Sequence, residues 1–527
     1  MMNKLRLVVL GAGYAGMTLA AHLDNKISKE DMQIILVDAN SYHQLIQEAH
    51  LVAGGFRKPE ETRIPIPDLI QDTNIQFIQS VVKKVKADEN KIILENSDDI
   101  NYDYLVVALG ASTKFFGIRG AVEYALTLRS IDDGLTIYNK ASKLLSKSNQ
   151  GKNKHGIGKD KETKNIVIVG GGATGVGVAG ALADLNHNAS SSSSEKTKVM
   201  IITASSTLLP GFDTKIIDEV VRILHKKDVS IITRTTAAGV RKDSIVFEDG
   251  REAGSRAEIP SSLTIWTPGI QGYDLLMEPQ VEKTNNGRIV INDYCQTKEY
   301  PNIFCLGDIS AMKEPSGKIT NPPLGHIAIS QAIYLAESIA NYFIHNIKPL
   351  QKFQSNVNVR ILSLGLNDYI GLVNNIVVTG DIARITKGFK QEAHLESISS
   401  GEVTFATKIY KNDPVSSLLS SVFITIFSLS KTLKNKAWAY DTNKMSSHDD
   451  QDSVTEKVDE FVKRLKGKTR DAEVNIKDVQ ENALESRVND IQDDPKFRLW
   501  RNRLEKKVPQ RQGDHPNGTI HTSKENE

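Results

Sequence analysis

The stretch Leu5-Arg-Leu-Val-Val-Leu10, followed at once by Gly11-Ala-Gly-Tyr-Ala-Gly16, decides the fold of this 527-residue chain. A short apolar run that meets a glycine-rich turn is typical of a buried strand feeding a helix. A helical segment continues to about Asn25, and a second strand, Gln33–Val37, ends at Asp38. This order predicts a βαβ unit in a parallel sheet that is covered on both faces.

The same pattern occurs a second time. Asn165–Val169 is an apolar run, and Gly170-Gly-Gly-Ala-Thr-Gly175 opens a helix that extends to about Leu185. The strand Lys198–Ile202 follows, but the next residue is Thr203 instead of an acid. The chain therefore contains an internal duplication of one supersecondary unit.

The first glycine motif predicts a dinucleotide site. Gly11 permits a tight turn, Gly13 lets the backbone approach a pyrophosphate, and Gly16 lets the helix pack closely on the strand. The helix N-terminus offers free N–H groups and the positive end of the helix dipole. Asp38 can accept hydrogen bonds from both hydroxyls of a ribose.

The second motif has the glycines without the acid. A dinucleotide can still sit on Gly172 and Gly175, and Thr203 tolerates a 2′-phosphate better than a carboxylate would. The alternative interpretation is a relic of the fold that has lost its affinity for nucleotides.

Four further segments fit a flavoprotein that binds two nucleotides. Two of them, Asp103–Gly110 and Leu263–Gly269, are strands that run into small-residue turns. Asn302–Asp308 is a strand ending in Gly-Asp, where a carboxylate can hold a ribityl hydroxyl. The last, Asn321–His326, precedes a predicted helix, 327–341, whose N-terminus can face the pyrimidine edge of a flavin.

Composition excludes several other kinds of site. Sixty-six Lys and Arg residues against 64 Asp and Glu give a net charge of +2, so no global basic field favours nucleic acid. The two cysteines, Cys295 and Cys305, cannot form a disulfide framework, an Fe–S cluster or a multi-cysteine metal site, and we expect no metal. We expect both to be small buried residues, which leaves a bound cofactor as the redox centre.

No stretch reaches the roughly 18–20 uncharged apolar residues of a membrane-spanning helix. The first strand begins by Leu5, so we expect no secretory signal and an intracellular location. Pro414–Ser430 carries no charge, shows apolar residues at helical spacing and precedes a basic and aromatic group that ends at Tyr440. This predicts an amphipathic helix near 414–433 that lies in the plane of a membrane, with docking on the protein itself or a dimer interface as the alternative.

The remaining segments are polar. Lys147–Lys164 and Ser190–Ser194 predict mobile surface linkers. The highly charged tail, 441–527, is predicted to be mostly disordered, with one or two conditional helices.

With these motifs in place, the chain resembles the flavoproteins with two dinucleotide-binding domains. Within them it looks like the type II NADH dehydrogenases and the apoptosis-inducing-factor-like quinone reductases, from about Leu5 to Tyr440. The resemblance implies FAD in the first unit, NADH or NADPH in the second, and electron transfer through the flavin to a membrane quinone without proton pumping. The residues implied for FAD are Gly11, Gly13, Gly16, Asp38, Val82, Ala108, Gly110 and Asp308. His326, at the start of the predicted helix, is expected beside the ring by helix-start geometry, and it is the one candidate for a catalytic side chain in chemistry that the flavin otherwise carries out. Those implied for the nicotinamide nucleotide are Gly170, Gly172, Thr174, Gly175 and Gly269.

The chain departs from that family at three places. Gly177 stands where a glutamate usually follows the second glycine motif, and Thr203 replaces a second acid. The predicted quinone-side helix opens Gly325-His326-Ile327 in place of the usual Ala-Gln. Whether the donor is NADH, NADPH or neither therefore stays open. Two other functions also stay open: an FAD oxidoreductase with another donor or acceptor, such as a sulfur compound or a soluble carrier, and a flavin-binding regulatory protein with a vestigial second site.

We therefore predict an α/β, doubly wound protein with two Rossmann-like domains, the second inserted in the first. The expected FAD domain comprises 1–112 and 270–345, and the NAD(P) domain 113–269. A membrane-contact region, 346–440, and the charged tail, 441–527, follow. The expected location is cytoplasmic, peripheral on the inner face of the membrane, with contact through 414–440 and with a homodimer left open.

Overall fold

The computed structural model describes residues 4–149, 164–189, 197–250, 254–273, 276–314, 316–345, 352–354, 359–373 and 376–402. The amphipathic segment near 414–433, the charged tail and most of the two polar linkers lie outside the described residues. The predictions made for those segments stay predictions.

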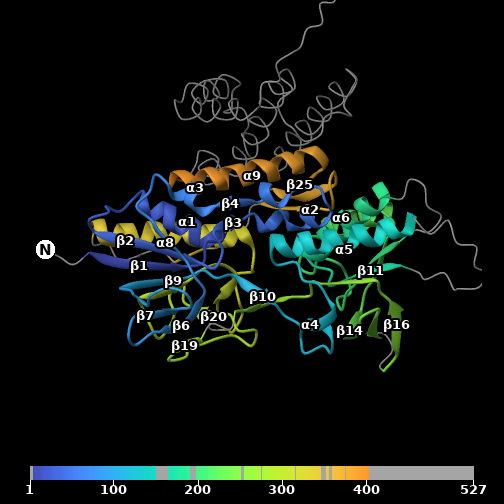
Figure 1. The fold of residues 1–527 in the computed structure, drawn as a ribbon, viewed down its shortest axis with the longest axis horizontal. Helices are drawn as coiled ribbons and strands as arrows, with labels where there is room; N and C mark the ends of the chain where they lie inside the picture. Colours follow the sequence, from blue (N-terminus) through green and yellow to red (C-terminus); the bar gives the residue numbers. More distant parts are fainter. Residues whose placement is uncertain are drawn as a thin grey trace, which may run out of the picture. The chain divides into compact units, whose positions relative to one another are not determined.

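A parallel five-stranded sheet forms around the first glycine motif. Its strand order is β21-β9-β1-β2-β5. The members are β1 (Leu5–Leu10), β2 (Met32–Asp38), β5 (Gln76–Gln79), β9 (Tyr104–Val107) and β21 (Ile303–Cys305). Helix α1 (Tyr14–Asp24) packs against β1, β2 and α8 (Gly325–His345), and the core lies between these elements (Figure 1).

A parallel four-stranded sheet forms around the second motif, in the order β13-β12-β11-β17. Its strands are β11 (Asn165–Val169), β12 (Lys198–Ile202), β13 (Val229–Ile232) and β17 (Leu263–Trp266). The helices beside it are α5 (Ile131–Asn149), α6 (Ala173–Ala189) and α7 (Thr214–Lys226). A second core cluster fills the space between this sheet and its helices.

The second sheet is inserted in the first. β21 and α8 follow the second sheet in sequence, yet β21 pairs with β9 and α8 packs on α1. The antiparallel pair β10 (Ala111–Thr113) and β18 (Ile270–Gly272) carries the chain from one sheet to the other and back. The predicted α/β architecture with an inserted second unit is confirmed, whereas the exact domain boundaries stay predictions.

Smaller sheets and short helices complete these two units. The small strands are β3 (Tyr42–Gln44), β4 (Arg63–Pro65), β6 (Val82–Lys86), β7 (Lys91–Leu94), β8 (Ile100–Asn101), β14 (Thr235–Val240), β15 (Ser244–Asp249), β16 (Arg256–Pro260), β19 (Leu276–Glu278), β20 (Ile289–Ile291) and β22 (Ser310–Met312). The short helices are η1 (Ile46–Glu48), α2 (Ala49–Ala53), η2 (Pro59–Glu61), α3 (Ile66–Ile70), α4 (Ala121–Tyr124) and η4 (Gly307–Ile309).

A third layer that the sequence did not predict comes from the region after α8. Strands β23 (Val359–Ser363), β24 (Tyr369–Val373) and β25 (Ile376–Thr379) form an antiparallel sheet that leads into α9 (Gly380–Ser400). Figure 1 shows α9, in orange, lying across α1 and α3. The C-terminal end of α9 is held against α1, because His22 on α1 hydrogen-bonds Ser397 at 2.7 Å. Gly401 lies so close to α1 that a Cβ atom there would overlap the Ala21 carbonyl.

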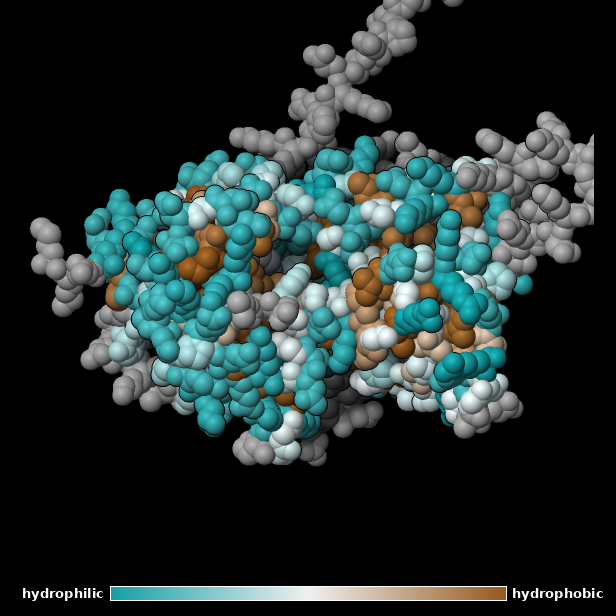
Figure 2. All heavy atoms as spheres, turned by 60° about the horizontal axis from the view of Figure 1, so that its bottom comes forward, coloured by the Kyte–Doolittle hydropathy of each residue, from teal (hydrophilic) through white to brown (hydrophobic). Residues whose placement is uncertain are grey.

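The structure shifts several predicted bounds. α6 extends four residues beyond the predicted end at Leu185, and α8 begins two residues before the predicted start at 327. On the face drawn in Figure 2, hydrophilic side chains predominate and apolar ones gather in separate patches. Among the described residues, no helix is long and apolar enough to cross a membrane.

Candidate functional site

The first glycine motif folds into a loop, and the space around each of its three glycines differs. Gly11 has φ +101°, and a Cβ atom there would lie 2.5 Å from the Ala108 carbonyl oxygen. A Cβ atom at Gly16 would overlap the Gly11 carbonyl oxygen, so only glycine lets α1 start this close to β1. A Cβ atom at Gly13 would meet nothing within 4 Å. Open space therefore remains at the position where the motif predicts a pyrophosphate.

Asp38 lies at the end of β2, beside this loop. Its Oδ2 accepts the Ala12 N–H at 2.7 Å, and its Oδ1 accepts the Asn40 backbone N–H at 2.7 Å and the Asn40 side-chain amide at 3.1 Å. A carboxylate offers about four lone-pair sites. Three are engaged within the protein, which fixes the carboxylate and leaves capacity for one further donor such as a ribose hydroxyl.

The other end of this site is built where β9 and β21 finish. Ala108 is buried after β9, and Gly110 has φ +74° with open space at its Cβ position. Asp308 follows Gly307 in η4, and its Oδ2 accepts from Arg129 Nη2 at 3.4 Å. The turn is held in place because the Gly307 N–H donates to Gln331 Oε1 on α8 at 2.8 Å.

The first turn of α8 lies against these loops. A Cβ atom at Gly307 would lie 3.3 Å from the Ala328 Cβ and 3.6 Å from the Ala15 Cβ, so α8, η4 and the glycine-loop helix meet at one place. His326 is in this turn, and its Nε2 is buried without a hydrogen-bond partner among the described residues. Burial, together with Lys390 and Arg360, lowers the pKa of His326 to about 3. A neutral imidazole with an unpaired nitrogen suits a bound polar group.

Val82 is the first residue of β6, where it pairs with Leu94 and is half-buried against the core. The structure gives it no polar side-chain role, and its predicted FAD contact stays a prediction.

The second glycine motif repeats the construction of the first. The Gly170 N–H donates to the Ile202 carbonyl at 2.8 Å, as the Gly11 N–H donates to the Val37 carbonyl at 2.7 Å. A Cβ atom at Gly175 would overlap the Gly170 carbonyl oxygen. The space beside Gly172 is again open.

Two more predicted residues surround this second loop. Thr174 is exposed in the first turn of α6. Gly269, with φ +144°, follows β17, and a Cβ atom there would lie 3.2 Å from the Phe116 ring. The second loop thus keeps the shape of a nucleotide cradle although its strand lacks the acid.

The structure explains why glycine stands at position 177. A Cβ atom there would lie 3.3 Å from the Ser363 carbonyl oxygen and 3.4 Å from the His50 ring. Even a Cβ atom at this position would require these neighbours to shift by a few tenths of an ångström, so glycine fits the position with least strain.

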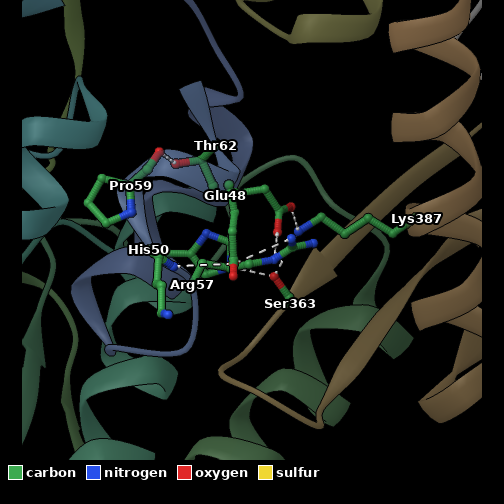
Figure 3. Close-up of polar contacts among 9 residues, drawn as sticks. Glu48, His50, Arg57, Pro59, Thr62, Ser363 and Lys387 are labelled. Carbon is green, nitrogen blue, oxygen red and sulfur yellow. Dashed lines mark hydrogen bonds and ion pairs between the residues drawn. The ribbon is translucent and has the colours of Figure 1, made fainter. Parts of the chain in front are cut away.

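A buried ionic cluster, which the sequence did not predict, lies beside Gly177 (Figure 3). We define it as Glu48, His50, Arg57, Ser363 and Lys387. Lys387 on α9 donates to Glu48 Oε1 at 2.7 Å and to Ser363 Oγ at 3.1 Å, and Arg57 Nε lies 4.0 Å from Glu48 Oε2. The His50 ring hydrogen-bonds Ser363 Oγ. No sequence signal joins these residues, since they come from segments more than 300 positions apart.

Charge pairing decides the protonation of this cluster. Burial opposes ionisation of Glu48, but Lys387, His50 and Arg57 together outweigh it and lower its pKa. Burial and the charge on Lys387 lower the pKa of His50 to about 3. Near neutral pH the cluster therefore holds an ionised carboxylate and a neutral imidazole.

His43 is buried in β3. Its Nδ1 bonds the Ala12 carbonyl at 2.9 Å, and its Nε2 lies 3.3 Å from His394 Nε2 on α9. Tyr14 stacks on His394 with ring centroids 4.5 Å apart. These contacts tie α9 to the first glycine loop.

Both cysteines are buried, as predicted. The side chains are fully inaccessible, and burial raises the pKa of both thiols far above the ordinary value. The Cys305 N–H bonds the Cys295 carbonyl at 2.9 Å, so both serve the packing beside β21. Among the described residues, no group of His, Cys, Asp and Glu side chains has the arrangement of a metal site.

Residues 5–332 match the family described as pyridine nucleotide-disulphide oxidoreductase. The chain belongs to that family. One relative, a type II NADH:quinone oxidoreductase of Staphylococcus haemolyticus, is 27% identical over 391 residues, covering 73% of this chain and 94% of its own. The enzyme of the same description from Staphylococcus aureus strain MSSA476 is 27% identical over 390 residues, with the same coverage of each chain.

Two solved structures have a similar fold. NDH2 of Plasmodium falciparum in complex with NADH has a TM-score of 0.64 at 17% identity, covering 81% of this chain and 98% of its own. The sulfide:quinone oxidoreductase of Aquifex aeolicus has a TM-score of 0.63 at 21% identity, covering 76% of this chain and 92% of its own.

Proposed function

We propose that this protein is an FAD-dependent NADH:quinone oxidoreductase. The observation that carries the proposal is the pair of glycine loops with matching hydrogen bonds and matching open space at Gly13 and Gly172. The relatives that match nearly their whole length are described as type II NADH:quinone oxidoreductases, which supports the same activity.

In this proposal the first loop holds FAD and the second holds the nicotinamide nucleotide. The proposed FAD residues are Gly11, Gly13, Gly16, Asp38, Val82, Ala108, Gly110, Asp308 and His326. The proposed nucleotide residues are Gly170, Gly172, Thr174, Gly175 and Gly269. Bound flavin supplies the ability to take up a hydride and to pass on electrons.

The chain itself supplies binding, orientation and a fixed protonation state. The N-termini of α1 and α6 offer N–H groups and positive dipole ends to two pyrophosphates. Asp38 is immobilised to receive a ribose hydroxyl. His326 offers a neutral nitrogen in the turn that meets the glycine loop and η4.

The structure weighs against two routes within the alternative functions, electron transfer through protein thiols and a vestigial second site. Transfer of electrons through protein thiols requires an accessible thiolate, and Cys295 and Cys305 are both fully buried. A vestigial second site would not be expected to keep the tight Gly170–Gly175 contact and the open Gly172 position.

The site of action completes the proposal. A quinone acceptor requires access to a membrane surface, and we assign that contact to 414–440 on the inner face, with the protein peripheral. This segment lies outside the described residues, so both its membrane contact and a homodimer formed through it stay proposals.

A turnover assay tests the function. The purified full chain should oxidise NADH in the presence of a short-chain quinone and should contain FAD. Gly172→Ala should raise the KM for NADH while the flavin stays bound, because its Cβ atom enters only the second cradle. Gly388→Ala, on α9 and equally open, is the matched control and should leave the KM unchanged. Absence of NADH-dependent quinone reduction in the flavin-loaded parent would refute the proposal.

A further inference from the structure

The second nucleotide site differs from the first where an adenosine ribose would bind. Leu10 pairs with Val37 in the first sheet, and Val169 pairs with Ile202 in the second. The first glycine of each loop donates to the last residue of these pairs, Gly11 to Val37 and Gly170 to Ile202. Thr203, the residue after Ile202, therefore takes the place of Asp38. From Thr203 to Phe212 the sequence contains no charged residue, so this loop presents no carboxylate to a phosphate.

The segment after β12 is instead rich in hydroxyl groups. The Ser205 N–H donates to Thr203 Oγ1 at 3.4 Å, and a Cβ atom at Gly171 would lie 3.1 Å from that oxygen. Thr203 therefore lies directly beside the glycine loop, where Asp38 bonds Ala12 in the first copy. Two more hydroxyl residues, Ser206 and Thr207, are exposed in the same loop.

The connection between β13 and β14 brings a cation to this loop. The Arg234 N–H donates to the Ser205 carbonyl at 2.9 Å, and the Arg234 carbonyl accepts the Gly250 N–H at 2.7 Å. Its backbone has φ +54°, in the left-handed region. Arg234 is exposed, and no carboxylate within the described part of the chain pairs with it.

The first glycine-loop unit shows that the residue equivalent to Arg234 reaches the loop after the second strand. The Ser80 N–H donates to the Asp38 carbonyl and the Thr235 N–H to the Thr203 carbonyl, both at 2.9 Å. The residue before Ser80 is Gln79, and its side-chain amide donates to the Ala39 carbonyl at 3.2 Å. Arg234, the residue before Thr235, is thus held by its backbone at the corresponding loop, with a longer and charged side chain.

We propose that the second nucleotide site accepts the 2′-phosphate of NADPH, with Arg234 as its counter-charge and Thr203 and Ser205 as hydroxyl partners. The inference rests on the proposed function and names the nucleotide that this site takes. A guanidinium presents several N–H donors in a planar fork that matches phosphate oxygens. An acid at the end of the second strand, by contrast, binds the ribose hydroxyls of NADH and repels a 2′-phosphate.

The test measures dissociation constants of NADPH and NADH for the flavin-loaded full chain, by titration calorimetry. The parent should bind NADPH at least as tightly as NADH. Arg234→Ala should weaken NADPH by about ten- to a hundredfold, the usual effect of removing a hydrogen bond to a charged group, and leave NADH unchanged. Thr203→Glu should weaken NADPH and spare NADH. Arg222→Ala, an exposed arginine on α7, is the matched control and should change neither.

The outcomes separate this inference from the function beneath it. Binding of NADH with NADPH a hundredfold weaker would overturn the inference and leave the oxidoreductase intact. An equal loss of both nucleotides in Arg234→Ala would also overturn it, because a 2′-phosphate contact must discriminate. Binding of neither nucleotide to the parent would overturn the proposed function itself.

Discussion

Removal of the Glu48 carboxylate should destabilise the protein severely. Glu48 is 4% exposed and accepts from Lys387 at 2.7 Å, with Arg57 at 4.0 Å. The side chain of Lys387 is itself only 13% exposed, so Glu48→Leu leaves a buried lysine with the Ser363 hydroxyl as its remaining oxygen partner in the cluster. Loss of one partner of a buried ion pair costs about 3–5 kcal/mol.

The assay is urea unfolding followed by circular dichroism, with the change in free energy taken from the transition midpoint. Glu219→Leu is the matched control, because Glu219 pairs with an arginine that is 64% exposed, and such surface pairs contribute about 0–1 kcal/mol. The double variant Glu48→Leu/Lys387→Met removes both charges and should recover part of the loss. If Glu48→Leu were as stable as the Glu219→Leu control, the claim that the ionic cluster stabilises the packing of α9 would be refuted.

Three further results should follow from the site. Gly16→Ala should prevent stable folding of the first unit because of its overlap with the Gly11 carbonyl, whereas Gly13→Ala should fold and lose flavin, as protein-bound absorbance after gel filtration will show. Folding lowers the pKa of His50 from 6.5 to about 3, so the neutral ring contributes to stability above pH 6.5. This contribution should be lost as the pH falls towards 3. His50→Gln should therefore make the fall of the unfolding free energy with decreasing pH shallower. Cys295→Ala/Cys305→Ala should keep NADH-dependent quinone reduction, and loss of turnover in a variant that still binds flavin would contradict a flavin-only redox centre.

The sequence predicted those parts of the fold that depend on local patterns. The strand-glycine-helix units were identifiable because Gly16 and Gly175 are required by local backbone contacts, with the carbonyl groups of Gly11 and Gly170 respectively. The inserted architecture followed from finding a second unit between two parts of the first. The predicted burial of both cysteines was likewise confirmed.

The third layer could not be predicted in this way. The contact of α9 with α1 depends on pairs such as His22 and Ser397, which lie 375 positions apart. The ionic cluster joins Glu48 to Lys387, and neither residue lies in a motif. The reason for glycine at 177 also appeared only when β23 and His50 were seen to occupy the adjacent space.

Anaerobic reduction of the bound flavin tests the central claim most directly. One equivalent of nicotinamide nucleotide, added to the flavin-loaded protein without oxygen, should bleach the visible flavin absorbance, and a short-chain quinone should restore it. Full recovery of the oxidised spectrum, with one quinone reduced per nucleotide consumed, is the predicted result. A flavin that neither NADH nor NADPH bleaches, or that stays reduced after quinone is added, would contradict the proposed electron path.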